Sequence, residues 1–138
     1  MRKAFFVVSS VLLVTFVLQF VFAAVGAFTK PAGDGAYALH SITGMAVIPV
    51  LTLLTTLFAA LAKAPGRLVG LAILPLGLVV VQALIAMLAN AFTDASGAST
   101  PLGLTVAGLH AVNGIVAVHV VVSVTRAARR LGGPVEAA

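Results

Sequence analysis

One short pattern occurs twice in the chain, as Leu39-His40-Ser41-Ile42-Thr43-Gly44 and as Leu109-His110-Ala111-Val112-Asn113-Gly114. Both copies read Leu-His-x-x-x-Gly, and both open a long apolar run. In a helix the glycine lies one turn after the histidine, on the same face. Two imidazoles in matched positions predict that the helices carrying them face each other across one flat ligand.

The composition indicates a membrane protein. Of the 138 residues, 62% are hydrophobic and only 8% are charged, whereas about one quarter of a soluble domain is charged. The length predicts a single domain over residues 1–138. The absence of cysteine excludes disulfides, iron–sulfur clusters and thiol nucleophiles.

Four apolar runs are each long enough to cross about 30 Å of hydrocarbon. They predict an all-α integral membrane four-helix bundle, with helices at about 4–27, 35–64, 68–91 and 101–131 and a tail over 132–138. The first run begins like a signal peptide, but it is too long for one, so we expect it to be retained as a helix. Pro49 and Pro75 lie inside predicted helices and are expected to kink them.

The basic residues predict the topology. Seven of the eight Lys and Arg lie near the two termini or in the middle turn, at the ends of apolar runs. Cytoplasmic ends of membrane helices carry such residues, so we expect a multi-pass protein of the cell membrane with both termini in the cytoplasm. The loops holding Lys30, Asp34 and Asp94 would face outward. Because the positive charges form no single face, a nucleic-acid partner is not expected.

The two halves of the chain share further landmarks in the same order. Gln19 and Gln82 each stand in the first helix of a half, and each of these helices closes on Ala-Phe-Thr, at 27–29 and 91–93. The Leu-His-x-x-x-Gly helix then follows. This order predicts a duplicated hairpin with repeat units of about 1–66 and 67–131, arranged as a parallel repeat around an approximate two-fold axis along the membrane normal.

The paired histidines predict a haem site. Ionisable groups inside membrane spans are rare and usually functional. His40 and His110 lie at the outer ends of the second and fourth helices, which can face each other diagonally in a bundle. Haem iron accepts two axial imidazoles, so both histidines are the predicted metal ligands of one haem b. Gly44 and Gly114 would allow the edge of the macrocycle to lie against the backbone.

Gln19 and Gln82 are the remaining predicted site residues. They are expected to hydrogen-bond either the ligand-bearing helices or the ligand, as groups around metal-bound imidazoles commonly do. Thr43 and Asn113 carry the same two alternatives. A zinc site is poorly supported, because the chain lacks cysteine and no carboxylate lies within a predicted helix.

Two observations keep other interpretations open. Membrane histidines, and a glycine one turn later, can serve helix packing alone. In addition, His40 lies 25 residues before Pro65 and His110 lies 22 before Gly132, which at 1.5 Å per residue is a height difference of about 4–5 Å. A kink at Pro49 would reduce this difference in height between the two histidines.

His119 is expected outside the site. It lies nine residues after His110, about 900° around the helix, and therefore on the opposite face. We predict that it is buried and bonded to a neighbouring helix; the alternative is a proton or subunit contact near the membrane centre.

The chain resembles one four-helix half of the haem A synthase family over nearly its whole length. The resemblance rests on His40 and His110 at the outer ends of the second and fourth helices, and on 25–29 and 33–35 in place of that family's glycine-rich outer segment. It implies haem binding. The family has a glutamate three residues before a ligand histidine, where this chain has Tyr37, which argues against haem A synthesis. Small di-haem membrane cytochromes are a weaker likeness, because they need two histidine pairs.

The sequence thus predicts a bis-histidine haem protein for electron transfer or haem handling, without catalytic residues of its own. A quinone or a redox protein is the expected partner besides the lipid bilayer, and the oligomeric state is left open. The alternative is a non-enzymatic membrane subunit or small-ligand carrier whose histidines only pack.

Overall fold

The computed structural model describes residues 1–31, 33 and 35–132. Asp34, predicted in the first outer loop, and residues 133–138, predicted as most of the tail, lie outside the described residues. Within them the chain is helical, and its elements follow in order. They are α1 (Arg2–Phe28), α2 (Ala38–Ile42), the π-helical turn η1 (Thr43–Val47), α3 (Ile48–Leu61), α4 (Gly66–Ala91) and α5 (Pro101–Gly132).

Four helical segments are long and apolar enough to cross a membrane, which confirms the predicted four-helix membrane bundle. They span Arg2–Phe28, Ala38–Leu61, Gly66–Ala91 and Pro101–Gly132. Three of them match the predicted helices to within two residues at each end. The second is shorter than the predicted 35–64, and α5 includes Gly132, the first residue of the predicted tail.

Local backbone hydrogen bonds explain where the second span begins and where it ends. At its start, a turn closed by the Ala38 N–H on the Gly35 carbonyl precedes the helix. At its end, Lys63 adopts a φ of 55° and the Ala64 N–H bonds back to the Ala59 carbonyl at 3.0 Å. This left-handed residue with a six-to-one hydrogen bond is a Schellman termination.

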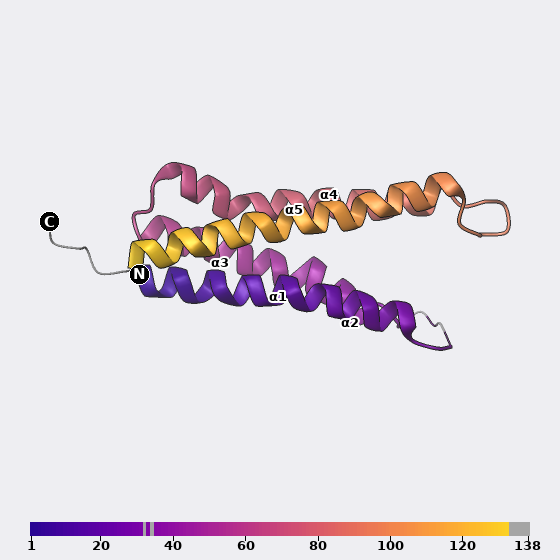
Figure 1. The fold of residues 1–138 in the computed structure, drawn as a ribbon, viewed down its shortest axis with the longest axis horizontal. Coiled ribbons are helices and arrows are strands. Elements are labelled where there is room, and N and C mark those ends of the chain that lie inside the picture. The colour runs from indigo at the N-terminus through magenta and orange to yellow at the C-terminus, as the bar shows by residue number, and fades with distance from the viewer. Residues whose placement is uncertain (32, 34, 133–138) are drawn as a thin grey trace, which may run out of the picture.

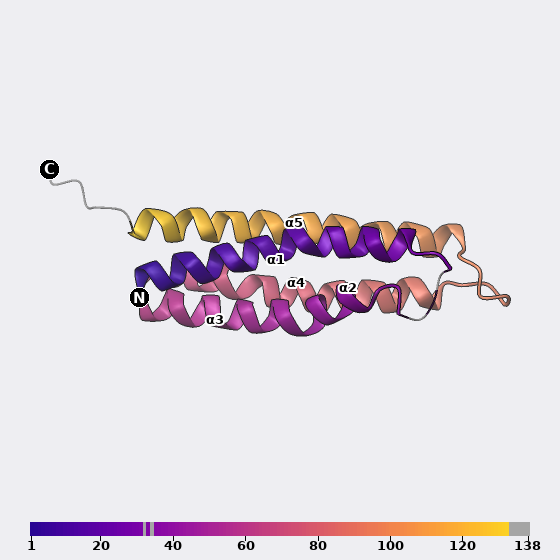
Figure 2. The ribbon, with the colours of Figure 1, turned by 90° about the horizontal axis from the view of Figure 1, so that it is seen from below.

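The four spans form a ring in which each packs against two neighbours (Figures 1 and 2). Helix α1 packs against α3 and α5, and α4 packs against the same two helices. The second and fourth spans, which carry the paired histidines, are therefore diagonal. The start of α1, the α3–α4 turn and the end of α5 lie at one end of the bundle, which we call the basic end because it carries seven Lys and Arg. The two longer loops lie at the opposite end.

The second span contains a change of helical type next to Pro49. The π-helical turn η1 ends two residues before this proline, which falls in the first turn of α3. A proline lacks an N–H and crowds the carbonyl four residues earlier, and a local i→i+5 turn accommodates both effects. Pro75, by contrast, is buried inside α4, which continues through it as one helix.

The buried core lies at the basic end and in the middle of the bundle. One cluster of buried residues joins all four spans at the basic end, and a second joins three of them in the middle. A hydrogen bond from Thr125 Oγ1 to the Ser9 carbonyl, 3.1 Å long, ties α5 to α1 in this half. No cluster of this kind fills the opposite half of the described residues, and that is where the pocket lies.

Candidate ligand pocket

A pocket of about 290 Å³ lies among the four spans in the less tightly packed half. Its walls are almost entirely apolar, and the polar exceptions are two histidines, two glutamines, one asparagine and one serine. Protein interiors are normally close-packed with few voids, so this apolar space sets the half of the bundle that holds it apart from the packed core. The lining residues include Gln19, His40, Gly44, Gln82, His110 and Gly114, so all six predicted site residues meet here.

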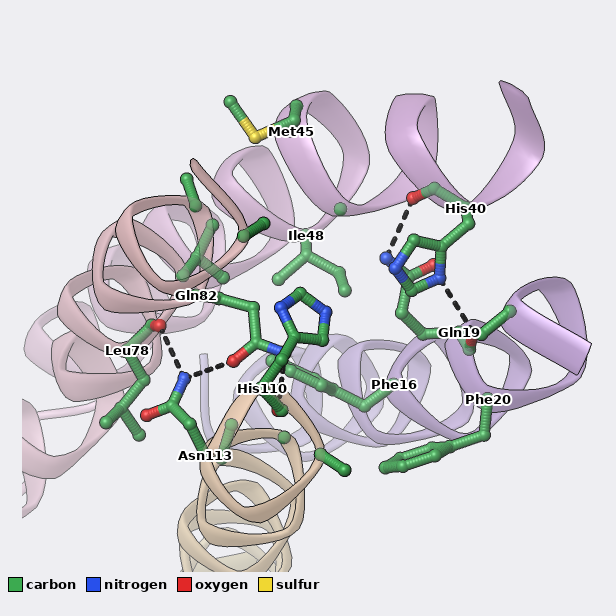
Figure 3. Close-up of a pocket in the computed structure, with 18 of the residues that line it drawn as sticks. Phe16, Gln19, Phe20, His40, Met45, Ile48, Leu78, Gln82, His110 and Asn113 are labelled. Carbon is green, nitrogen blue, oxygen red and sulfur yellow. Dashed lines mark hydrogen bonds between the residues drawn. The ribbon is translucent and has the colours of Figure 1, made fainter. Parts of the chain in front are cut away.

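His40 and His110 point into this pocket from diagonal helices (Figure 3). Their ring centroids are 6.1 Å apart, and the ring planes are inclined by 44°. The difference in height expected from the sequence is largely removed, because α3 ends at Leu61, 21 residues after His40, while α5 ends 22 residues after His110.

The side chain and backbone of His40 are both held by Gln19 of α1. The Nδ1 atom of His40 lies 3.1 Å from the Gln19 backbone carbonyl, and the Gln19 Nε2 atom donates to the His40 carbonyl at 2.8 Å. Because a carbonyl only accepts, Nδ1 of His40 carries the proton in this arrangement. In a neutral imidazole with its proton on Nδ1, the Nε2 atom has a free lone pair, which is the state that a metal ligand requires.

The second half of the chain repeats one of these bonds. Gln82 Nε2 donates to the His110 carbonyl at 2.7 Å, as Gln19 does to His40. The Gln82 backbone carbonyl lies beside the His110 ring, but Nδ1 of His110 is buried and has no hydrogen-bond partner in the described part of the chain. Of the two alternatives predicted for the glutamines, the structure has the contact with the histidine-bearing helices.

Asn113 extends the polar network of the second half. Its Nδ2 atom donates to the Leu78 carbonyl at 2.9 Å and also contacts Oε1 of Gln82. The Gln82 side chain is thus held at both ends (Figure 3). The corresponding oxygen of Gln19 is buried without a partner in the described structure. Thr43, the matched residue of the first half, is buried but does not reach Gln19 with a hydrogen bond.

The two glycines of the repeated pattern differ in what occupies the space beside them. A Cβ atom on Gly44 would lie 2.6 Å from Nε2 of Gln19, whereas one on Gly114 would meet its nearest neighbour, Phe20, at an ordinary 3.6 Å. Gly44 therefore makes room for the amide that bonds to His40. The contact between Gly44 and Gln19 was not predictable from the sequence, which predicted only that the edge of a ligand would lie against Gly44.

The described residues contain no group of three or more His, Asp or Glu that could hold a metal ion. Two histidines on an apolar pocket lack the four-ligand set of a structural zinc site.

His119 lies outside the pocket, as predicted, but the expectation that it is buried is wrong. The residue is exposed on the outer surface of α5. Its backbone carbonyl accepts a hydrogen bond from the Ser123 hydroxyl, but its imidazole has no hydrogen-bond partner among the described residues. No helix of the described bundle covers that face of α5.

A family model matches residues 19–90, slightly more than half of the chain, and its description is a family of unknown function, DUF6220. The match includes Gln19, His40, Gly44 and Gln82, while His110 and Gly114 follow it. Because this match covers more than half of the chain, the chain belongs to the DUF6220 family. No curated protein and no solved structure matches it.

Proposed function

We propose that this member of the DUF6220 family binds one haem b, with His40 and His110 as the two axial ligands. The observation that carries the proposal is the pair of imidazoles, 6.1 Å apart between ring centroids, that reach one apolar pocket from diagonal helices.

The separation of the rings suits a shared metal ion. A metal–imidazole bond is about 2 Å long, and the ring centre lies about 1 Å beyond the bound nitrogen, so two imidazoles on opposite sides of one ion have centroids about 6 Å apart. The free Nε2 of His40 supports the same interpretation, because the Gln19 carbonyl holds the proton on the other nitrogen. A small rotation of His110 toward the Gln82 carbonyl would give it the same support.

The surroundings favour a flat apolar group with a polar edge. The pocket walls are apolar, and the site lies toward the outer loops, where propionates could reach water or the exposed Lys30. The resemblance to one half of haem A synthase supports the two-histidine ligation, while Tyr37 in place of that family's glutamate argues against haem A synthesis.

Electron transfer or haem handling follows from this ligation. Iron with two protein imidazoles has no free position for a substrate, and the pocket offers no carboxylate to act as an acid or base. A membrane quinone or a redox protein is the corresponding partner. We place the protein in the cell membrane with the basic end in the cytoplasm, because the positive-inside rule assigns such ends to that side.

The pocket volume favours one alternative, a carrier of a smaller apolar ligand with purely structural histidines. At about 290 Å³ the pocket lies near the lower limit for small-molecule sites, and a macrocycle would have to move the helices apart. The hydrogen bonds between His40 and Gln19 also fit a histidine that joins two helices.

Visible absorption of the purified protein separates the two functions. We expect a protein produced with ample haem to show a sharp Soret band and split bands after reduction. His40→Ala and His110→Ala should each abolish this spectrum, and His119→Ala is the matched control that should retain it. A colourless, folded wild-type protein that gives no bis-imidazole spectrum on haem titration would refute haem binding and leave the carrier.

A further inference from the structure

His119 is an exposed polar group deep within a membrane span. It lies seven residues before Arg126, the first of three arginines at the end of α5, and seven residues of helix rise about 10 Å. The His119 side chain is exposed and makes no hydrogen bond within the described structure. It also lies on the side of α5 opposite His110, so the haem proposed above does not explain it.

An exposed imidazole at that depth needs a partner. Ionisable residues within membrane spans almost always face a protein interior or a water-filled cavity, where they pair. Long Lys and Arg side chains can reach the membrane surface from within, but an imidazole has only one methylene and cannot cover about 10 Å. The face of α5 around His119 is therefore expected to be covered by protein.

The neighbours of His119 on this face follow a heptad spacing. Val112 and Ile115 are 57% and 62% exposed, Val122 is half-buried, and the spacing continues to exposed residues at both ends. The full stripe is Thr105, Gly108, Val112, Ile115, His119, Val122 and Arg126. Alternating steps of three and four residues with β-branched side chains are typical of the seam between two parallel helices, and a single polar residue in such a seam fixes its register.

We propose that this face of α5 joins two copies of the chain in a parallel dimer, with His119 of each copy hydrogen-bonded to His119 of the other. Copies inserted with the same topology place His119 at the same depth without any further adjustment. A neutral imidazole has one donor and one acceptor nitrogen, so it is complementary to a second imidazole. The arginines at 126 end the seam at the membrane surface, where lipid phosphates can separate them.

A second exposed stripe competes for this role. It runs along α4 with the same spacing through Gly70, Leu74 and Gly77, and a Cβ atom on either glycine would meet no neighbour. Small residues allow helices to approach closely in membranes, but this stripe contains no polar group that lipid would leave unpartnered. We therefore assign the dimer contact to α5.

Cysteine cross-linking tests the arrangement directly, because the native chain contains no cysteine. Single variants Val112→Cys, Ile115→Cys and Val122→Cys, oxidised in native membranes, should give covalent dimers. Leu109→Cys and Ala111→Cys, exposed on the two flanks of the stripe, are matched controls that should give few. Leu74→Cys reports on the competing α4 face.

Energy transfer between labelled copies at increasing lipid dilution measures how much His119 contributes to self-association. His119→Leu should weaken self-association by about 3- to 18-fold, the range for one hydrogen bond between membrane helices, while His119→Asn should retain most of it. The proposal is overturned if the stripe variants cross-link no better than the flank controls, if Leu74→Cys alone gives dimers, or if His119→Leu dimerises like wild type. The dimer and the haem can fail separately, since His119→Leu is expected to keep the absorption spectrum.

Discussion

Replacing Gly44 with alanine is expected to leave the bundle less stable than the same change at Gly114 does. The new Cβ at 44 would lie 2.6 Å from Nε2 of Gln19, so the amide must leave the position from which it bonds to the His40 carbonyl. At Gly114 the nearest atom would be 3.6 Å away, which is an ordinary contact. The two positions are matched in the repeated pattern, so each serves as the control for the other.

The magnitude follows from what differs between the two replacements. Both exchange a helical glycine for alanine, a gain of about 1 kcal/mol in helix propensity. Only Gly44→Ala also loses a hydrogen bond between helices, which in membrane proteins contributes about 0.6 kcal/mol on average and about 1.7 kcal/mol at most. We therefore expect Gly44→Ala to be less stable than Gly114→Ala by about 1 kcal/mol.

Unfolding in mixed micelles, driven by added SDS and followed by circular dichroism, measures this difference in the free energy of unfolding. The double variant Gln19→Ala/Gly44→Ala tests the cause, because without the amide there is nothing for the new Cβ to displace. The role assigned to Gly44 is refuted if the two single variants are equally stable. It is also refuted if Gly44→Ala remains less stable than Gly114→Ala when both are made in the Gln19→Ala background.

Three further outcomes are expected. Asn113→Leu removes two hydrogen bonds from α5 to α4 and should lower the free energy of unfolding by about 1 kcal/mol in the same SDS titration; an unchanged midpoint would contradict this. Thr125→Val removes the bond to the Ser9 carbonyl with little change of shape and should cost about 0.6 kcal/mol. In the loop between α4 and α5, the Ser96 hydroxyl and then backbone N–H groups lower the pKa of Asp94 below its ordinary 3.8. Protection of the loop amides should therefore be complete above pH 3.8 and lost as the pH falls through the lower folded-state pKa. Hydrogen exchange measures this, and Asp94→Asn should remove the pH dependence.

The sequence was sufficient for the number, order and approximate bounds of the spans, because apolar runs of this length have few alternatives. It was also sufficient to bring His40 and His110 to one place. It did not predict the early end of the second span, since Lys63 gives no sign that it will adopt a left-handed conformation. Next to Pro49, where the sequence predicts a kink, the structure has the π-helical turn η1, a change of helical type that the proline alone does not specify.

The hydrogen bonds of the site could not be predicted from the sequence, for a different reason. The two histidine-bearing helices follow loops of unequal length, so matched spacing along the chain could not fix matched contacts in space. In the structure both glutamine amides donate to the histidine carbonyls. Asn113 also hydrogen-bonds the glutamine of its half, whereas the matched Thr43 does not. The position of His119 along the chain places it opposite His110 but does not show whether a helix packs on that side, and four helices in a ring leave an outer face on each.

The diagonal placement of the histidines has a consequence for how the two hairpins depend on each other. The first hairpin brings His40 and the second brings His110, so neither contains a complete pair of ligands. Any molecule that needs both can bind only the assembled form, and by mass action it must then strengthen the association of the halves. The α3–α4 turn is thus a covalent link between two units that a bound ligand would join a second time, from within.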